Sequence, residues 1–476
     1  MLSQVPSENL SLLVGKNESE NLVFIPEKSL YQNIFICGTI GSGKTSSCMY
    51  PFTRQLIRSF SKNPEYKIGM LILDVKGNFY KEVLRFANSA GRLEDVHMIE
   101  LGGNTFYNPL DKPNLKPSVL ANRLKTILTL FSPNNSESYW LDKVEQVLTE
   151  SIKFCRLYND GYVTFVELHK LVTLPEYFLE KVSVIKELFT NGHLSKRDCY
   201  DAYSSIDFFQ KELFSLDSRT LSIIQSEITR ITNCFVSDYE VLHTFCPKRE
   251  EINFHGFYHL VQNGDIVVLN MNISQYQNLS KIIAAYLKLD FQTEVLNRLS
   301  DPSITSARSV CFICDEFHEY CTTSDADFFA QSREAKCINI VATQSYSSLL
   351  HTLKDEYAVK VILQNMINKF WFRTDDSYTI EDIQKQIGKE DKVKMVKSIS
   401  ENAPKTSFHY LTNSFVSHGS GLSESINESI STDFIYDSHF FTQELETFSC
   451  LSFLSDGYKI LKPMKLKLIP YFLMKF

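Results

Sequence analysis

A glycine-rich turn near the amino terminus constrains the fold more than any other stretch of the chain. Gly38, Gly43, Lys44 and Thr45 have the spacing G-x-x-x-x-G-K-[ST], and an apolar run, residues 33–37, leads directly into it. With 17 glycines in 476 residues, an accidental match is expected in only about one such sequence in a hundred. An ordinary glycine turn is the alternative, and the strand pattern before the turn weakens it. The stretch therefore predicts a strand, a phosphate-binding loop and a helix, in that order.

This loop carries the groups that bind a nucleoside phosphate together with Mg²⁺. We expect the Lys44 ammonium to reach the β- and γ-phosphates and the Thr45 hydroxyl to bind Mg²⁺. Backbone N–H groups of the turn and the dipole of the next helix add positive potential. The residues expected to surround the nucleotide are consecutive: Gly38, Thr39, Ile40, Gly41, Ser42, Gly43, Lys44, Thr45 and Ser46.

Two carboxylates end a second apolar run. Residues 310–314 read Val-Cys-Phe-Ile-Cys, and Asp315 and Glu316 follow them. In a nucleotide hydrolase, Asp315 would hold Mg²⁺, partly through water, and Glu316 would activate the attacking water as general base. The alternative is a strand that simply ends at a polar turn. The pair Lys44 and Thr45 earlier in the chain favours the catalytic interpretation.

Two further polar residues are candidates for acting on the γ-phosphate. Gln344 ends another apolar run, residues 338–343, and would sense this phosphate if that strand neighbours the loop strand; a solvated turn glutamine is the alternative. Arg333 lies between the carboxylate strand and the glutamine strand, where it would stabilise transition-state charge in a neighbouring subunit. An exposed helix arginine is the alternative for Arg333.

The pattern along the chain separates sheet-forming from helical parts. Strand-like runs alternate with helical periodicity over residues 1–114 and 250–476, which predicts an α/β fold with one doubly wound, mainly parallel sheet. Residues 115–249 have periodic apolar positions, which predicts an inserted all-helical domain. Residues 400–432 are rich in Ser, Asn, Gly and Glu and are predicted to form a mobile loop. The last apolar runs, residues 448–476, are expected to pack on the sheet edge.

Composition bears on partners and compartment. The net charge of −7 and the pI near 5.9 indicate no overall basic surface, so DNA contacts must come from a local patch or a pore. The 11 cysteines are scattered, several within apolar runs, as is typical of buried thiols in a reducing compartment. The sequence has neither a leader pattern nor 18 consecutive apolar residues, which favours a cytoplasmic protein.

The order of the motifs resembles one protein family. Six stretches occur in the order seen in conjugative coupling proteins, the TraG/TraD group of the HerA/FtsK motor superfamily: residues 38–45, 73–77, 107–110, 314–316, 333–336 and 342–345. The resemblance implies a RecA-like P-loop NTPase domain with an all-helical insertion. It implies a ring, expected to be hexameric, that binds ATP between subunits and moves DNA through its centre. It also implies that Gln344 is a γ-phosphate sensor and Arg333 a trans-acting arginine.

The chain departs from this family in two places. Val-Lys-Gly-Asn follows Asp74 where many relatives have Pro after the Asp and an acid after the Gly, so we expect this turn only to line the site. Relatives in secretion machines usually begin with transmembrane helices, whereas this chain begins almost at the motor. The sequence therefore leaves three possibilities open. The protein works as a soluble motor, it docks on a separate membrane partner, or it serves in defence against foreign DNA together with an effector protein.

The sequence thus predicts Mg²⁺-dependent ATP hydrolysis that drives DNA translocation, in DNA transfer or in defence. The DNA would be gripped through its phosphates without sequence preference, and the pore-lining residues and the strandedness of the DNA are open. The alternative is an ATP-switched module that recruits protein or nucleoprotein partners without moving DNA.

Overall fold

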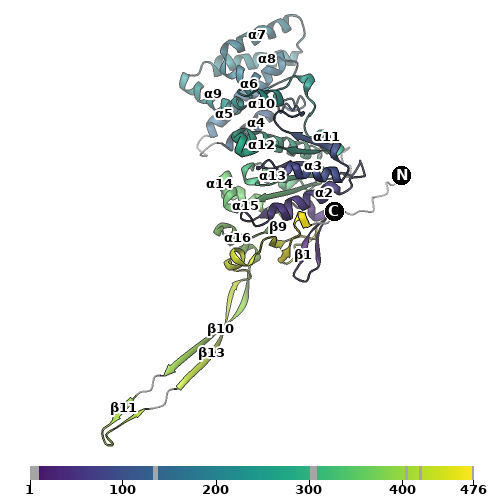
Figure 1. Cartoon of the computed structure of the whole chain (residues 1–476). Coiled ribbons are helices and arrows are strands. Elements are labelled where there is room, and N and C mark those ends of the chain that lie inside the picture. Colours follow the sequence, from purple (N-terminus) through teal and green to yellow (C-terminus); the bar gives the residue numbers. More distant parts are fainter. Residues whose placement is uncertain (1–9, 132–137, 301–307, 403–405, 418–420, 474–476) are drawn as a thin grey trace. The chain divides into compact units, whose positions relative to one another are not determined.

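The computed structural model describes residues 10–131, 138–300, 308–402, 406–417 and 421–473 (Figure 1). The chain divides into two compact units. The larger unit comprises Met1–Arg373 with Glu446–Phe476, and the smaller unit comprises Thr374–Leu445. Among the described residues, no helix combines the length and the apolar character that crossing a membrane demands.

The larger unit is built on an 11-stranded sheet with the order β2-β1-β15-β14-β9-β3-β8-β7-β4-β6-β5. Neighbouring strands from β9 to β5 run parallel, and the pairs from β9 through β14, β15 and β1 to β2 are antiparallel. The strands are β1 (Ser11–Asn17), β2 (Leu22–Pro26), β3 (Ile34–Cys37), β4 (Gly69–Leu73), β5 (Val96–Ile99), β6 (Ile266–Leu269), β7 (Val310–Cys314), β8 (Cys337–Thr343), β9 (Asn368–Trp371), β14 (Ser449–Phe453) and β15 (Met464–Lys467). The predicted mainly parallel α/β sheet is confirmed.

The carboxyl-terminal strands are not at the edge of the sheet, and this prediction is wrong. β14 pairs with β9 on one side and with β15 on the other, and β15 also pairs with β1. The outermost strands of the sheet are β2 and β5. The amino-terminal hairpin of β1 and β2 adds to the sheet beyond β15, so β1 pairs with the edge that β15 would otherwise leave open. Apolar patterning identifies a strand but carries no information on its neighbours.

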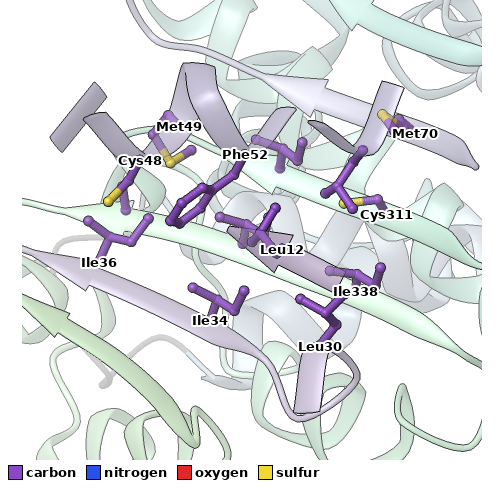
Figure 2. Packing of buried hydrophobic residues seen from close by; sticks show 14 of the residues in the cluster. Leu12, Leu30, Ile34, Ile36, Cys48, Met49, Phe52, Met70, Cys311 and Ile338 are labelled. Carbon is purple, nitrogen blue, oxygen red and sulfur yellow. The ribbon is translucent and has the colours of Figure 1, made fainter. Parts of the chain in front are cut away.

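Helices pack against both faces of the sheet. Along β3, the side chains of Ile34 and Ile36 join a buried cluster with Phe52 of α2, which Figure 2 shows. Phe35, between them, contacts Tyr346 of α14 on the other face, with ring centroids 5.7 Å apart. This two-residue alternation is what a strand buried on both faces requires. The helices of this region are α1 (Glu27–Leu30), α2 (Tyr50–Arg58), α3 (Phe79–Ser89), α11 (Tyr258–Asn263), α12 (Ile273–Asn297), α13 (Asp325–Gln331), α14 (Tyr346–Leu353) and α15 (Glu356–Gln364).

The long connection from β5 to β6 is largely helical. The α-helices that precede α11 on this connection are α4 (Pro117–Thr129), α5 (Ser138–Tyr158), α6 (Phe165–Thr173), α7 (Pro175–Thr190), α8 (Lys196–Asp207), α9 (Ser218–Val236) and α10 (Tyr239–Phe245). Phe178 is central to their packing, with ring centroids 5.1 Å from Phe154 and 4.7 Å from Phe209. These helices belong to the same compact unit as the sheet. The separate all-helical domain over residues 115–249 therefore stays a prediction.

The smaller unit contains a long two-stranded ribbon where the sequence predicts a mobile loop. β10 (Lys389–Asn402) and β13 (Gly421–Phe434) pair antiparallel along their whole lengths, and β11 (Thr406–His409) pairs with β12 (Ser414–Ser417). Most of the described part of residues 400–432 is thus paired as strands through cross-strand backbone hydrogen bonds instead of forming an irregular loop, and the mobility of this segment stays a prediction. Residues 403–405 and 418–420 of the predicted loop lie outside the described residues. This unit, which also contains α16 (Ser377–Ile387), interrupts the predicted continuous domain of residues 250–476.

Candidate active site

The predicted phosphate-binding loop lies at the carboxyl end of β3, within the parallel part of the sheet. β3 pairs with β8 on one side and with β9 on the other, so three strand ends meet at the loop. The Thr39 N–H donates to the Arg373 carbonyl at 2.9 Å and ties the loop to the segment after β9. The carboxyl edge of such a sheet is where α/β proteins bind their ligands.

The helix after the loop begins with a wide π-helical turn, η1 (Thr45–Met49), and continues as α2. Pro51 lies near the start of α2 and has no N–H, so it cannot donate to the carbonyl four residues earlier. A π-turn at this place accommodates the missing bond. The first N–H groups of the helix have no partner within the helix and are available to a phosphate.

Lys44 is held in the middle of the loop. Its side chain is buried, and its ammonium donates to the carbonyl oxygens of Gly38 and Thr39, the latter at 3.1 Å. Burial lowers the pKa of Lys44, and the carboxylates of Glu316 and Asp315 oppose that shift. The loop therefore presents a fixed cation next to two acidic side chains.

Asp315 follows β7 and meets the loop directly. The Thr45 hydroxyl donates to Asp315 Oδ2 at 2.9 Å. Burial, together with the neighbouring carboxylates of Glu316 and Asp74, raises the pKa of Asp315 to about 6. A hydroxyl and a carboxylate side by side are oxygen ligands of the kind that Mg²⁺ takes together with phosphate and water oxygens, so these residues fit the ion.

Glu316 adopts an unusual backbone conformation for a residue with a side chain. Its φ of +51° lies in the left-handed region, and its N–H donates to Asp315 Oδ1 at 3.0 Å. The Glu316 carboxylate is buried, and its Oε2 has no hydrogen-bond partner among the described residues. Nδ1 of His318 lies 3.7 Å from this oxygen, and burial lowers the pKa of His318. A buried, unpaired carboxylate oxygen is suited to accept a proton.

Lys44, Thr45 and Glu316 line one pocket of about 490 Å³. It is lined by Thr39, Ile40, Gly41, Gly43, Lys44, Thr45, Ser46, Tyr50, Lys76, Glu316, Thr447, Phe448, Tyr471 and Phe472. No sequence pattern predicts the wall made by Thr447, Phe448, Tyr471 and Phe472, because only the pairing of β14 and β15 within the sheet brings these residues to the loop. No chemistry follows from the sequence for Lys76 either. The position of Lys76, two residues after the acid that follows an apolar strand, is a signal that places it at the carboxyl edge of the sheet.

Gln344 lies at the loop, whereas Arg333 does not. β8 pairs with β3 so that Thr343 lies opposite Cys37, and Gln344 therefore leaves the sheet beside the loop. This meets the condition on which the sensor prediction depends, and the sensor role itself stays a prediction. Arg333 is exposed and precedes β8, and it lines a different pocket with Asn33 at the amino ends of the strands. Within its own subunit, Arg333 is remote from the candidate site.

Replacing Gly43 with Ala is expected to lower the free energy of unfolding by about 2–4 kcal/mol, through a left-handed backbone and a collision with an aromatic ring. Gly43 has a φ of +101°, and a Cβ atom added there would lie 2.6 Å from Cδ1 of Phe448. Gly41 has a φ of +78° but open space around it, so Gly41→Ala is the matched control with a loss of only about 1–2 kcal/mol. Chemical denaturation without nucleotide measures both, and equal losses would contradict the role of Phe448.

Comparison with known proteins supports the resemblance predicted from the motifs. A family model described as the TraM recognition site of TraD and TraG matches residues 309–427. No curated protein sequence matches the chain. Among solved structures, unbound TrwBdeltaN70, a bacterial conjugative coupling protein, has a TM-score of 0.61 at 13% identity, over 95% of this chain and 87% of that chain.

Two further solved structures have the same fold. The plasmid coupling protein TrwB in complex with ADP and Mg²⁺ has a TM-score of 0.62 at 11% identity, over 99% of this chain and 97% of that chain. VirB4 of Thermoanaerobacter pseudethanolicus has a TM-score of 0.55 at 13% identity, over 99% of this chain and 100% of that chain. The chain therefore has a RecA-like P-loop NTPase fold and resembles the conjugative coupling proteins, in sequence over residues 309–427 and in fold over nearly its whole length.

Proposed function

We propose that this protein hydrolyses ATP with Mg²⁺ at the site formed by residues 38–46, Asp315 and Glu316. The observation that carries the proposal is the hydrogen bond between Thr45 and Asp315, at 2.9 Å across a separation of 270 residues. The fold thereby joins a phosphate-binding lysine to a pair of carboxylates. TrwB, which has this fold, has been solved with ADP and Mg²⁺ and with a non-hydrolysable ATP analogue, which supports these ligands for the present chain.

Each residue of the site has a distinct part in this reaction. Lys44 binds the β- and γ-phosphates, and the loop N–H groups hold the remaining phosphate oxygens. Glu316 takes a proton from a water molecule whose oxygen attacks the γ-phosphorus, and ADP leaves with the electrons of the broken P–O bond. Thr45 and Asp315 would hold Mg²⁺, Asp315 partly through water, and the ion when bound neutralises phosphate charge. Gln344 senses the γ-phosphate from the end of β8.

Hydrolysis drives DNA translocation by a ring of subunits, expected to be hexameric. The fold likeness to TrwB, which is named as a bacterial conjugative coupling protein, supports a part in DNA transfer. Arg333 acts at the nucleotide of a neighbouring subunit, since it is exposed and lies at the sheet edge opposite its own loop. DNA is held through its phosphates without sequence preference. We place the protein in the cytoplasm, attached to a membrane through a separate partner when its work requires it.

A second function has a specific observation in its favour. The family model that matches residues 309–427 is described as the recognition site for a protein, TraM. In this alternative, ATP controls the recruitment of a protein or nucleoprotein partner, and DNA is not moved. The recruited partner would be a membrane or effector protein.

DNA is expected to raise the ATP hydrolysis rate of the full chain severalfold, because a translocase couples each ATP turnover to movement along DNA. The rate is measured with no DNA, with single-stranded DNA and with double-stranded DNA, using the Glu316→Gln variant as the blank. Particle mass is measured in parallel with ATP and DNA. A rate that no nucleic acid changes but a protein partner does would replace the motor by the recruitment module. A chain that stays monomeric with ATP and DNA together would overturn the ring.

A further inference from the structure

The turn after β4 brings a second lysine to the pocket. Asp74 directly follows β4, and its carboxylate accepts three backbone N–H groups at 3.0 to 3.1 Å, those of Lys76, Asn78 and Phe79. Gly77 presses against Asn272, since a Cβ atom added there would lie 2.9 Å from the Asn272 nitrogen. The backbone that carries Lys76 is therefore held on both sides.

The Lys76 side chain extends from this fixed backbone to Glu316. Its Nζ lies 4.0 Å from Oε1 of Glu316, and it lines the same pocket as Lys44. Within the described part of the chain, Lys76 is the only lysine or arginine whose nitrogen comes within 4.0 Å of this carboxylate. His318 also faces Glu316, and the lowered pKa of His318 favours its neutral form. Lys76 thus supplies the permanent positive charge closest to Glu316.

The two lysines of the pocket differ in their freedom to move. Lys44 is buried and bonded to two loop carbonyls, so its position is set by the loop. The Lys76 side chain is 55% exposed, and its contact with Glu316 is at the outer limit of an ion pair. A half-exposed pair of this kind is weak, so the ammonium can leave the carboxylate at little cost when a stronger anion enters the pocket.

We infer that Lys76 makes the site selective for the terminal phosphate. Without a γ-phosphate, its ammonium pairs with Glu316; with ATP bound, it moves onto the γ-phosphate oxygens, which carry more negative charge than one carboxylate. This transfer takes the lysine partner away from the Glu316 carboxylate. The inference rests on the proposed nucleotide site and adds a residue to it.

The test compares ATPγS with ADP, each with Mg²⁺, by equilibrium binding to the full chain. Lys76→Met keeps the length of the side chain and removes its charge. We expect it to weaken ATPγS binding about tenfold, with ADP binding changed by no more than about twofold. Lys76→Arg should retain most of the ATPγS affinity. Lys81→Met, an exposed lysine on α3, is the matched control and should change neither affinity.

A double-mutant cycle separates this role from a structural one. Glu316→Gln removes the competing anion, so it should change ATPγS affinity by a different factor in the Lys76 background than in the Lys76→Met background, and the ratio of the two factors measures the coupling of Lys76 to Glu316. A lysine that only stabilised the turn would show no such coupling.

The outcomes distinguish the inference from the proposed function. Equal effects of Lys76→Met on ATPγS and ADP, or no effect on either, would overturn the role of Lys76 and leave the nucleotide site intact. Failure of the unaltered chain to bind either nucleotide would overturn both.

Discussion

Replacing Glu316 with Gln is expected to slow ATP hydrolysis by about 10²–10⁴-fold, because the amide keeps the shape of the side chain but cannot take a proton from water. Nucleotide binding should survive, since Lys44, Thr45 and the loop N–H groups are unchanged. Phosphate release at saturating ATP and Mg²⁺ measures the rate, and ATPγS binding measures the affinity. Lys44→Ala should instead lose nucleotide binding, because it removes the cation at the phosphates.

Glu319→Gln is the matched control for Glu316→Gln. Glu319 lies three residues further along, pairs with Lys281 at 2.5 Å and does not line the pocket. Its neutralisation should leave hydrolysis close to that of the unaltered chain. If Glu316→Gln hydrolysed ATP as fast as Glu319→Gln, Glu316 would not be the base, and the proposed reaction at this site would fail.

Replacing Asp290 with Asn is expected to lower the free energy of unfolding by about 3–5 kcal/mol, because it leaves buried cations without their counter-charge. Asp290 lies in α12 and is buried. Its carboxylate contacts Lys112 at 2.8 Å, Arg123 of α4 at 2.9 Å and the Tyr107 hydroxyl at 2.9 Å. This cluster joins the first part of the connection from β5 to β6 to α12. Denaturant titration at pH 7 measures the loss.

The effect of Asp290 depends on pH in a defined direction. Burial alone would raise the pKa of Asp290, but Lys112 and Arg123 bring it below its ordinary value. A carboxylate with a lowered pKa stabilises the fold above its unfolded pKa, near 3.9, and this contribution is lost as pH falls through the folded pKa. The difference in the free energy of unfolding between the unaltered chain and Asp290→Asn should therefore have its full value at pH 7 and decrease below about pH 4.

An exposed aspartate is the control for Asp290. Asp327 lies in the first turn of α13, and Asp327→Asn should cost less than about 1 kcal/mol. If both variants lost the same stability, the buried cluster would not contribute in the way its geometry indicates.

The chemistry of the site could be predicted from the sequence wherever neighbouring residues create it. The spacing of Gly38, Gly43 and Lys44 specifies a loop that closes on itself, and an apolar run before Asp315 specifies a buried strand with an acid at its end. Such signals are local, because backbone conformation and side-chain period act over a few residues. The doubly wound sheet followed from the same alternation of strands and helices.

Contacts between distant segments could not be predicted in this way. No local pattern shows that Phe448 packs against Gly43, that β14 and β15 enter the interior of the sheet, or that the polar residues around 400–432 pair as a ribbon. Strand order depends on which backbone hydrogen bonds and buried faces are satisfied together across the whole chain, and many orders suit the same pattern.

The glycine-rich loop illustrates the difference between what local sequence predicts and what contacts between distant segments decide. By itself, the sequence was enough to predict a phosphate-binding loop at residues 38–45, because the loop carries its own N–H groups, its lysine and the start of its helix. Only the tertiary structure decided that Thr45 meets Asp315 and that Lys76 reaches Glu316. These residues follow β3, β4 and β7, which are far apart in the sequence, and the ends of these strands come together only when β8 pairs with β3 and β7, and β7 pairs with β4.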